Sequence, residues 1–89
     1  IRRIHGLTLD QYHALAEKQN FLCVICQEEP VVRKTKKRQL DGYVVDHDHT
    51  TGKVRGLLCH TCNAGVGFLK DNPDVLLSAA MYVENHRTT

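Results

Sequence analysis

Two Cys-x-x-Cys pairs are the residues of this sequence best suited to bind a metal. The first pair is Cys23 and Cys26, and the second is Cys59 and Cys62. Each pair can present two thiolates from one tight turn, and Zn²⁺ takes four such ligands at tetrahedral angles. This spacing suits zinc better than it suits two disulfides or an iron cluster. Because four cysteines leave no open position for a water or a substrate, we expect the zinc to hold the fold.

A second set of residues, placed between and just after the cysteine pairs, has the side chains that hydrolysis requires. Asp46, His47, Asp48 and His49 are consecutive, and Asn63 directly follows the last cysteine. The oxygens of Asp46 and Asn63 suit a hard ion such as Mg²⁺, and the imidazole of His47 can accept a proton near neutral pH. Adjacent residues of a regular strand point to opposite faces, so Asp46 and His47 can serve one site only if the strand ends or bulges there.

Several of these side chains have a structural interpretation beside the chemical one. Asp48 is best interpreted as a turn residue or as a hydrogen-bonding support for a histidine. His49 belongs either to the active site or to the turn, and Arg55 is either an exposed strand position or a phosphate contact. His47 could be a histidine satisfied within a turn, but the flanking acids and the downstream Cys-x-x-Cys-Asn favour chemistry.

A cluster of basic residues lies in one short stretch of the chain. The formal net charge is only +2, which is too small to identify a nucleic-acid partner by itself. The stretch has no apolar period, so it is predicted to be a loop or an exposed hairpin. It is either a solvated loop or a contact to the DNA backbone, with Lys36, Lys37 and Arg38 as the candidate DNA-binding residues.

Length and composition limit the class of protein. The chain has 89 residues, no tryptophan and 25% charged residues, which predicts one small domain. The hydrophobic core of such a domain is too small to stabilise the fold without a cross-link such as a bound zinc ion. No apolar run approaches the roughly 20 residues that span a bilayer, and no secretory signal is in view. We therefore expect a soluble, cytosolic protein.

Capping and periodicity signals divide this single domain, residues 1–89, into three parts. A Thr-x-x-Gln capping box starts a leading helix over 8–20. A central metal-binding unit covers 21–70. An Asn-Pro pair then starts a closing helix over 72–86. The apolar stripe of that helix consists of Val75, Leu76, Ala79, Ala80 and Val83.

The central unit is expected to combine a hairpin with a helix. β-branched and aromatic residues predict strands at 42–45 and 54–58, with the Asp-His-Asp-His run at the end of the first strand. A second helix should begin near His60 and run towards Leu69, and two glycines inside it indicate close packing or a short helix. A zinc knuckle then lies against a strand-to-helix junction, which is the layout of a treble-clef zinc site.

The run from Val45 to Cys59, with the following Cys62-Asn63-Ala64, resembles the recombination endonuclease VII family of phage-type HNH nucleases. The resemblance extends from the first cysteine pair to the second helix, and more loosely along the rest of the chain. It implies a small α+β fold of the ββα-metal (HNH) type with flanking helices. In that fold the hairpin and the second helix hold one magnesium-like ion, with a zinc site beneath.

The resemblance also implies roles for individual residues. Asp46 and Asn63 would bind the catalytic Mg²⁺ or Mn²⁺, and His47 would be the general base. His49 would contact the metal or orient the substrate. The implied activity is metal-dependent hydrolysis of DNA to 5′-phosphate and 3′-hydroxyl ends. Because a nuclease held by phosphates selects DNA by shape, we expect it to prefer branched, nicked or distorted DNA.

The best-known members of the family have a longer, helical C-terminal part that supports dimerisation and junction recognition. The present sequence ends at Thr89, so four-way-junction resolution and a homodimer both stay open. The resemblance places the protein in the cytoplasm of a bacterial or phage-infected cell. Two alternatives are a non-catalytic zinc module that binds nucleic acid or protein, and a nicking nuclease of phage genome packaging.

Overall fold

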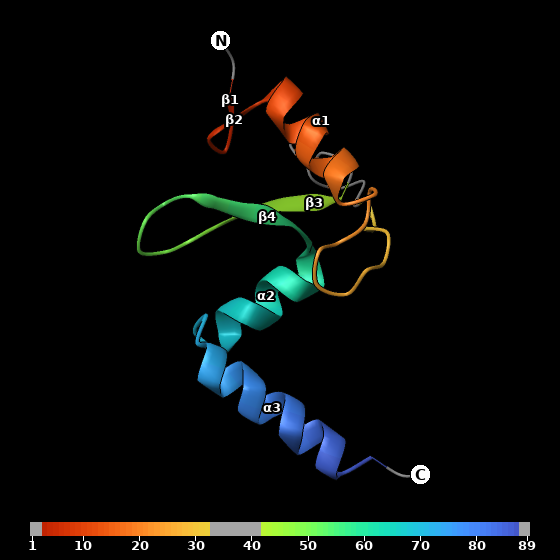
Figure 1. Cartoon of the computed structure of the whole chain (residues 1–89), viewed down its shortest axis with the longest axis vertical. Helices are drawn as coiled ribbons and strands as arrows, with labels where there is room; N and C mark the ends of the chain where they lie inside the picture. Colours follow the sequence, from red (N-terminus) through yellow and green to blue (C-terminus); the bar gives the residue numbers. More distant parts are fainter. Residues whose placement is uncertain (1–2, 33–41, 88–89) are drawn as a thin grey trace.

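The computed structural model describes residues 3–32 and 42–87, which form two antiparallel hairpins and three helices (Figure 1). This arrangement confirms the predicted small α+β class. Within the described ranges, no helix is both long enough and apolar enough to cross a membrane. The elements follow in the order β1 (Arg3–Ile4), β2 (Leu7–Thr8), α1 (Leu9–Lys18), β3 (Tyr43–His47), β4 (Val54–Cys59), α2 (His60–Phe68) and α3 (Pro73–Asn85).

The β3–β4 hairpin positions most of the predicted site residues. Its register is regular up to the pair of Asp46 with Gly56. The next pair joins His47 to Val54, so Arg55 has no partner on the opposite strand. This extra residue is a β-bulge, which bends a strand and turns its side chains. The bulge falls between Asp46 and His47, where the sequence argument required an irregularity.

The core lies between this hairpin and α1. As predicted, α1 begins at a capping box, in which the Thr8 hydroxyl accepts from the Gln11 N–H and the Gln11 side chain accepts from the Thr8 N–H. Tyr12 of α1 meets Tyr43 of β3 edge to face, with ring centroids 6.3 Å apart. The buried cluster consists of Tyr12, Ala16, Tyr43, Val45 and Leu57.

Gln19, directly after α1, ties that helix to the hairpin. Its side-chain amide accepts from the N–H of Leu57 and donates to the Leu57 carbonyl, both at 2.9 Å. The same amide donates to the carbonyl of Leu22, and the hydroxyl of Tyr43 donates to that carbonyl as well. The segment that leads into the first cysteine pair is therefore held to the hairpin by protein contacts.

The second helix, α2, begins directly where β4 ends and packs against both strands of the hairpin. Its observed range, His60–Phe68, agrees with the predicted one to within a residue. A Cβ added at Gly65 or Gly67 would meet no atom of the described residues within 4 Å. The suggestion that these glycines mark close packing is therefore wrong, and the alternative of a short helix is correct.

The closing helix, α3, starts at the predicted cap, where the Asn72 side chain accepts from the N–H groups of Asp74 and Val75. It then extends away from the hairpin (Figure 1). Of its predicted apolar stripe, only Leu76 and Ala79 are partly buried. The apolar period therefore predicted the helix correctly, but it did not show what the apolar face of the helix packs against.

Two regions differ from the sequence prediction or lie beyond the structure. Nothing in the sequence pattern predicts the β1–β2 hairpin, because two-residue strands are too short to show an alternating period. The basic stretch that contains Lys36, Lys37 and Arg38 lies outside the described residues. Its interpretation as a loop and as a DNA contact stays a prediction.

Candidate active site

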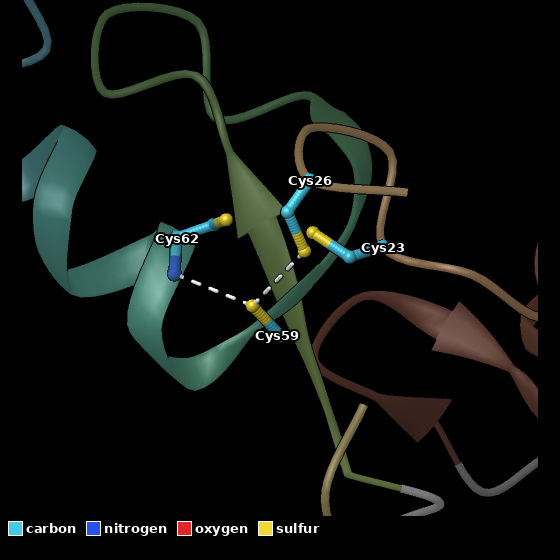
Figure 2. Close-up of side chains that lie close together, drawn as sticks. All are labelled: Cys23, Cys26, Cys59 and Cys62. Carbon is cyan, nitrogen blue, oxygen red and sulfur yellow. Dashed lines mark hydrogen bonds between the residues drawn. The ribbon is translucent and has the colours of Figure 1, made fainter. Parts of the chain in front are cut away.

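The four cysteines gather where the first cysteine turn meets the start of α2 (Figure 2). Their sulfur atoms all lie within 4.8 Å of one another, and the Sγ atoms of Cys26 and Cys59 are 3.9 Å apart. A tetrahedral zinc ion with Zn–S distances of about 2.3 Å would place its sulfur ligands about 3.8 Å apart. All four are free thiols rather than disulfides. The donors and their spacing fit the predicted structural zinc.

Local hydrogen bonds shape both halves of this cluster. In the cysteine turn, the N–H of Gln27 donates to the Cys23 carbonyl at 3.0 Å, and the N–H of Cys23 donates to the Glu28 carbonyl at 2.9 Å. At the other half, Cys59 is the N-cap of α2, and its Sγ accepts from the N–H of Cys62 at 3.4 Å. This contact satisfies one of the backbone N–H groups that have no partner within the helix at its start.

The electrostatics of the cluster favour a bound dication. Burial raises the pKa of the Cys23 thiol, but hydrogen bonds from neighbouring backbone groups, chiefly that of Cys59, outweigh it and lower that pKa from 9.0 to about 6. Burial and then the adjacent sulfur atoms raise the pKa of Cys62. One thiolate thus forms readily and opposes the ionisation of another. A zinc ion would replace this repulsion with attraction.

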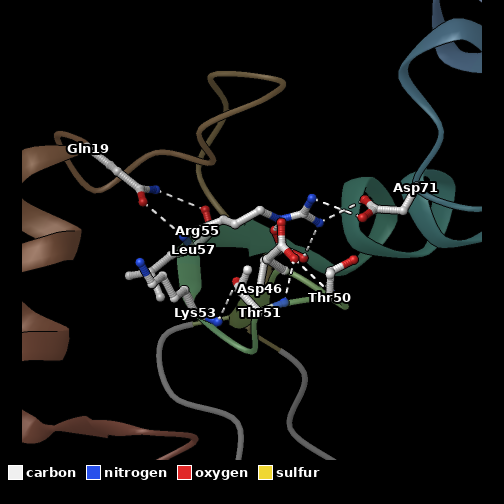
Figure 3. A network of polar contacts seen from close by, with 9 residues as sticks. Gln19, Asp46, Thr50, Thr51, Lys53, Arg55, Leu57 and Asp71 are labelled. Carbon is white, nitrogen blue, oxygen red and sulfur yellow. Dashed lines mark hydrogen bonds and ion pairs between the residues drawn. The ribbon is translucent and has the colours of Figure 1, made fainter.

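Asp46, the predicted metal ligand on β3, is bound to a guanidinium group (Figure 3). Nε of Arg55 donates to Oδ2 of Asp46 at 2.7 Å, and NH2 donates to Oδ1 at 3.1 Å. The far edge of the guanidinium binds Asp71, with NH1 to Oδ2 at 3.0 Å and NH2 to Oδ1 at 2.8 Å. Arg55 therefore joins two carboxylates through two bidentate contacts.

These three residues form a charged triad at the junction of β3, β4 and the turn between α2 and α3. The hydrogen bonds that Arg55 donates to Asp46 and then to Asp71 raise the pKa of Arg55, and the bond from Arg55 lowers the pKa of Asp71. Two carboxylates and one guanidinium carry a summed charge of −1. A cleft of about 280 Å³ beside the triad is also lined by apolar side chains of the cysteine turn, α2 and α3.

His47, the predicted general base, lies at the end of β3 and contacts the β1–β2 turn. Its Nε2 is 2.8 Å from the backbone carbonyl oxygen of His5. Because a carbonyl oxygen only accepts, Nε2 carries the ring hydrogen, and Nδ1 is the nitrogen that can take a proton. The backbone at His5 and Gly6 turns with positive φ, 50° and 92°. The N-terminal hairpin thereby sets the tautomer of His47.

The turn that joins β3 to β4 is organised by Asp48. One carboxylate oxygen of Asp48 accepts from the N–H groups of Thr50 and Thr51, at 2.8 and 2.9 Å. These two bonds lower the pKa of Asp48. The N–H of Gly52, which has φ of 76°, donates to the Asp48 carbonyl. The interpretation of Asp48 as a turn residue is therefore confirmed.

The remaining predicted site residues are not joined to Asp46 in this structure. Asn63 lies half-buried in the first turn of α2, and within the described ranges no hydrogen bond links it to Asp46. His49 is exposed in the β3–β4 turn, and its charge helps to lower the pKa of Asp71. In the described part of the chain, the four cysteines form the only group of three or more Cys, His, Asp or Glu with metal-binding spacing.

Two contributors to the site were missed by the sequence argument. The carbonyl of His5 has no sequence signal, because every residue carries a backbone carbonyl. Asp71 directly precedes the Asn-Pro cap of α3, and no sequence motif marks it. Its separation from Asp46 along the chain gives no hint that one arginine joins them.

A β-hairpin followed directly by a helix, with a four-cysteine cluster suited to zinc at their junction, defines a domain of the ββα-metal type. A model of the recombination endonuclease VII family matches residues 1–85. The chain therefore belongs to the recombination endonuclease VII family.

The chain is also similar to two phage proteins, each named Gene 59 protein. It is 40% identical to the protein of Mycobacterium phage D29 over 80 residues, which are 89% of this chain and 44% of the relative. It is 40% identical to the protein of Mycobacterium phage L5 over 82 residues, which are 91% of this chain and 46% of the relative. The chain thus spans less than half the length of these two relatives.

Proposed function

We propose that this domain is a metal-dependent DNA endonuclease that leaves 5′-phosphate and 3′-hydroxyl ends. The observation that carries the proposal is the contact between Nε2 of His47 and the His5 carbonyl, at 2.8 Å. That contact leaves Nδ1 of His47 as a proton acceptor, and His47 directly follows Asp46 in the chain, at the bulge of the hairpin. A binding module has no evident need for a histidine held in one tautomer.

In this mechanism, Nδ1 of His47 takes a proton from the water that attacks the scissile phosphorus. The ring then becomes positively charged, and its Nε2–H bond to the His5 carbonyl becomes a stronger, charge-assisted hydrogen bond. The carboxylate of Asp46 and the side-chain oxygen of Asn63 are the groups that would hold Mg²⁺ or Mn²⁺. When bound, such an ion stabilises charge on a phosphate oxygen and on the leaving 3′ oxygen.

His49 is the second histidine of the proposed site. It lies in the turn after β3, close enough for its charge to lower the pKa of Asp71. This position suits a contact to the substrate or to the metal better than a role in the core, because the side chain is exposed. Its loss should slow cleavage less than the loss of His47.

The substrate is proposed to be held by its phosphates, through Arg55 and the basic residues Lys36, Lys37 and Arg38. A site of this kind would prefer branched, nicked or otherwise distorted DNA, because a metal must reach a phosphate that intact duplex presents along a smooth backbone. Both relatives are phage proteins, so we place the activity in the cytoplasm of an infected bacterial cell. A homodimer also stays a proposal, and the exposed apolar side chains of α3 are where it would be sought.

The test compares His47→Ala with the wild type on linear, nicked, flapped and four-way DNA, with and without Mg²⁺. Loss of the general base should slow cleavage by roughly 10²–10⁴-fold, while zinc content and DNA affinity change little. His86→Ala is the matched control, because His86 is an exposed histidine at the end of α3.

The pH dependence provides a second readout of the same assignment. A base must be neutral to act, so the wild-type rate should rise with pH where an imidazole loses its proton and then level off. Cleavage by His47→Ala at the wild-type rate would overturn the assignment. A wild-type protein that binds DNA but cuts none of these substrates would instead favour the non-catalytic zinc module.

A further inference from the structure

Both oxygens of the Asp46 carboxylate are engaged by Arg55, at 2.7 and 3.1 Å. The function proposed above requires the same carboxylate to bind a divalent cation. Asp46 is also the least exposed side chain of the triad, at 13%, compared with 22% for Asp71 and 36% for Arg55. Because a cation and the guanidinium repel each other and compete for the same two oxygens, we expect a cation that binds Asp46 to displace Arg55 from it.

Asp71 determines what happens to the displaced guanidinium. It accepts from NH1 and NH2 of Arg55, at 3.0 and 2.8 Å, whereas Asp46 accepts from Nε and NH2. NH2 carries two hydrogens, one for each carboxylate, so the two contacts use different edges of the group. If Asp46 is released, the NH1 edge can stay on Asp71. The Nε edge then presents two parallel N–H donors, which match two oxygens of a phosphodiester.

We propose that Asp71 is a positioning residue that holds Arg55 while the Nε edge of the guanidinium moves from Asp46 to the substrate phosphate. The inference rests on the proposed function, because it requires Asp46 to be a ligand of the catalytic cation. In this arrangement Arg55 shields Asp46 before the cation binds and contacts DNA afterwards. Asp71 thus lowers the cost of taking Arg55 away from Asp46.

The backbone of Asp71 is suited to this role because it is fixed by its own contacts. Lys70 and Asp71 both have positive φ, 60° and 54°. The N–H of Asp71 donates to the Val66 carbonyl at 2.8 Å, and the N–H of Lys70 donates to the Gly67 carbonyl at 2.9 Å. The turn is thereby anchored to α2, and the carboxylate stays in place when Arg55 changes its second partner.

A double-mutant cycle on Mn²⁺ binding tests the inference without measuring cleavage. The proteins are zinc-loaded wild type, Asp71→Asn, Arg55→Gln and the double variant, and the free Mn²⁺ signal in electron paramagnetic resonance gives the dissociation constants. Asp71→Asn should weaken Mn²⁺ binding by about tenfold, because Arg55 then stays on Asp46. Arg55→Gln should strengthen binding, a gain that misfolding cannot produce. Asp74→Asn, an exposed carboxylate at the start of α3, should have no effect.

The double variant separates positioning from simple charge. When Arg55 is absent, Asp71→Asn should change the Mn²⁺ dissociation constant by less than about twofold, because there is no guanidinium left to hold. An unchanged tenfold weakening in that background would make Asp71 a direct ligand or a general negative charge, and would overturn the inference. So would wild-type Mn²⁺ affinity in both single variants.

A failure of the proposed function can be distinguished from a failure of this inference. Asp46→Asn should abolish the Mn²⁺ site in the wild-type background. If the wild type binds no Mn²⁺ through Asp46, the metal assignment and the inference fall together. If that binding is present but independent of Arg55 and Asp71, the inference alone is wrong, and the triad only joins the hairpin to the α2–α3 turn.

Discussion

The replacement Cys59→Ser separates the two roles of one residue, as a proposed zinc ligand and as the N-cap of α2. Serine is a good N-cap, so the variant keeps the cap and loses only the thiolate. Cys59→Ala loses both. Structural zinc contributes about 10–16 kcal/mol of apparent binding free energy, so a quarter share for one of four ligands is roughly 2.5–4 kcal/mol.

That magnitude is large for this fold. In the described part of the chain, only seven apolar residues are buried, among them Tyr12, Leu57 and Cys23. A loss of 2.5–4 kcal/mol should lower the melting temperature by roughly 10–30 °C, since about 1 kcal/mol shifts a domain of this size by 4–8 °C. Cys59→Ala should melt lower again, by the roughly 1 kcal/mol that an N-cap is worth. Thr61→Ser, an exposed change in the same helical turn, should melt with the wild type.

The assay is thermal unfolding followed by circular dichroism, together with zinc analysis of each protein. We expect one zinc per wild-type chain and unfolding of the domain by a chelator. Because zinc binds the thiolate form, protons compete with it, so this stabilisation should be lost as the pH falls. A wild type without zinc, or a chelated protein with an unchanged melting curve, would refute the reasoning.

Three further predictions concern DNA binding and two glycines. The triple replacement of Lys36, Lys37 and Arg38 by alanine should weaken DNA binding across unrelated sequences. It should also reduce the slope of log binding constant against log salt concentration by about 0.9 for each lost phosphate contact. An unchanged slope in a salt titration would mean that the stretch is only a solvated loop. Gly65→Ala in α2 should add roughly 1 kcal/mol of stability through helix propensity and so raise the melting temperature, because its Cβ would meet no atom of the described residues within 4 Å. Gly42→Ala should lower it, because a Cβ there would lie 2.8 Å from the Val31 carbonyl oxygen and the residue has φ of 79°.

The parts of the fold that could be predicted from the sequence are those with local causes. The capping box at Thr8 and the Asn72 cap start α1 and α3 where the sequence placed them. The β-branched strands and the cysteine spacing gave the hairpin and the metal cluster, because strand propensity and tight-turn ligation act over a few residues. The exposed face of α3 shows the limit of this reasoning, since an apolar period does not say what covers it.

The site was less predictable because its contacts join distant residues. Arg55 meets Asp71 across the whole of α2, and His47 meets the carbonyl of His5. A backbone carbonyl has no residue type, so no sequence pattern can mark it. The role of the N-terminal hairpin as a support for His47 therefore had to come from the structure.

The β-bulge connects these contacts to the fold. In a regular register, His47 would lie opposite Arg55, and a period of two would place both side chains on one face, away from Asp46. The extra residue moves His47 opposite Val54, and Arg55 reaches the carboxylate of Asp46 instead. Gly56, opposite Asp46, adds no side chain on the face of the hairpin that carries Asp46, and a Cβ there would already be 3.4 Å from the Gln19 side chain. One inserted residue thus separates His47, the proposed general base, from Arg55, so that each meets its own partner.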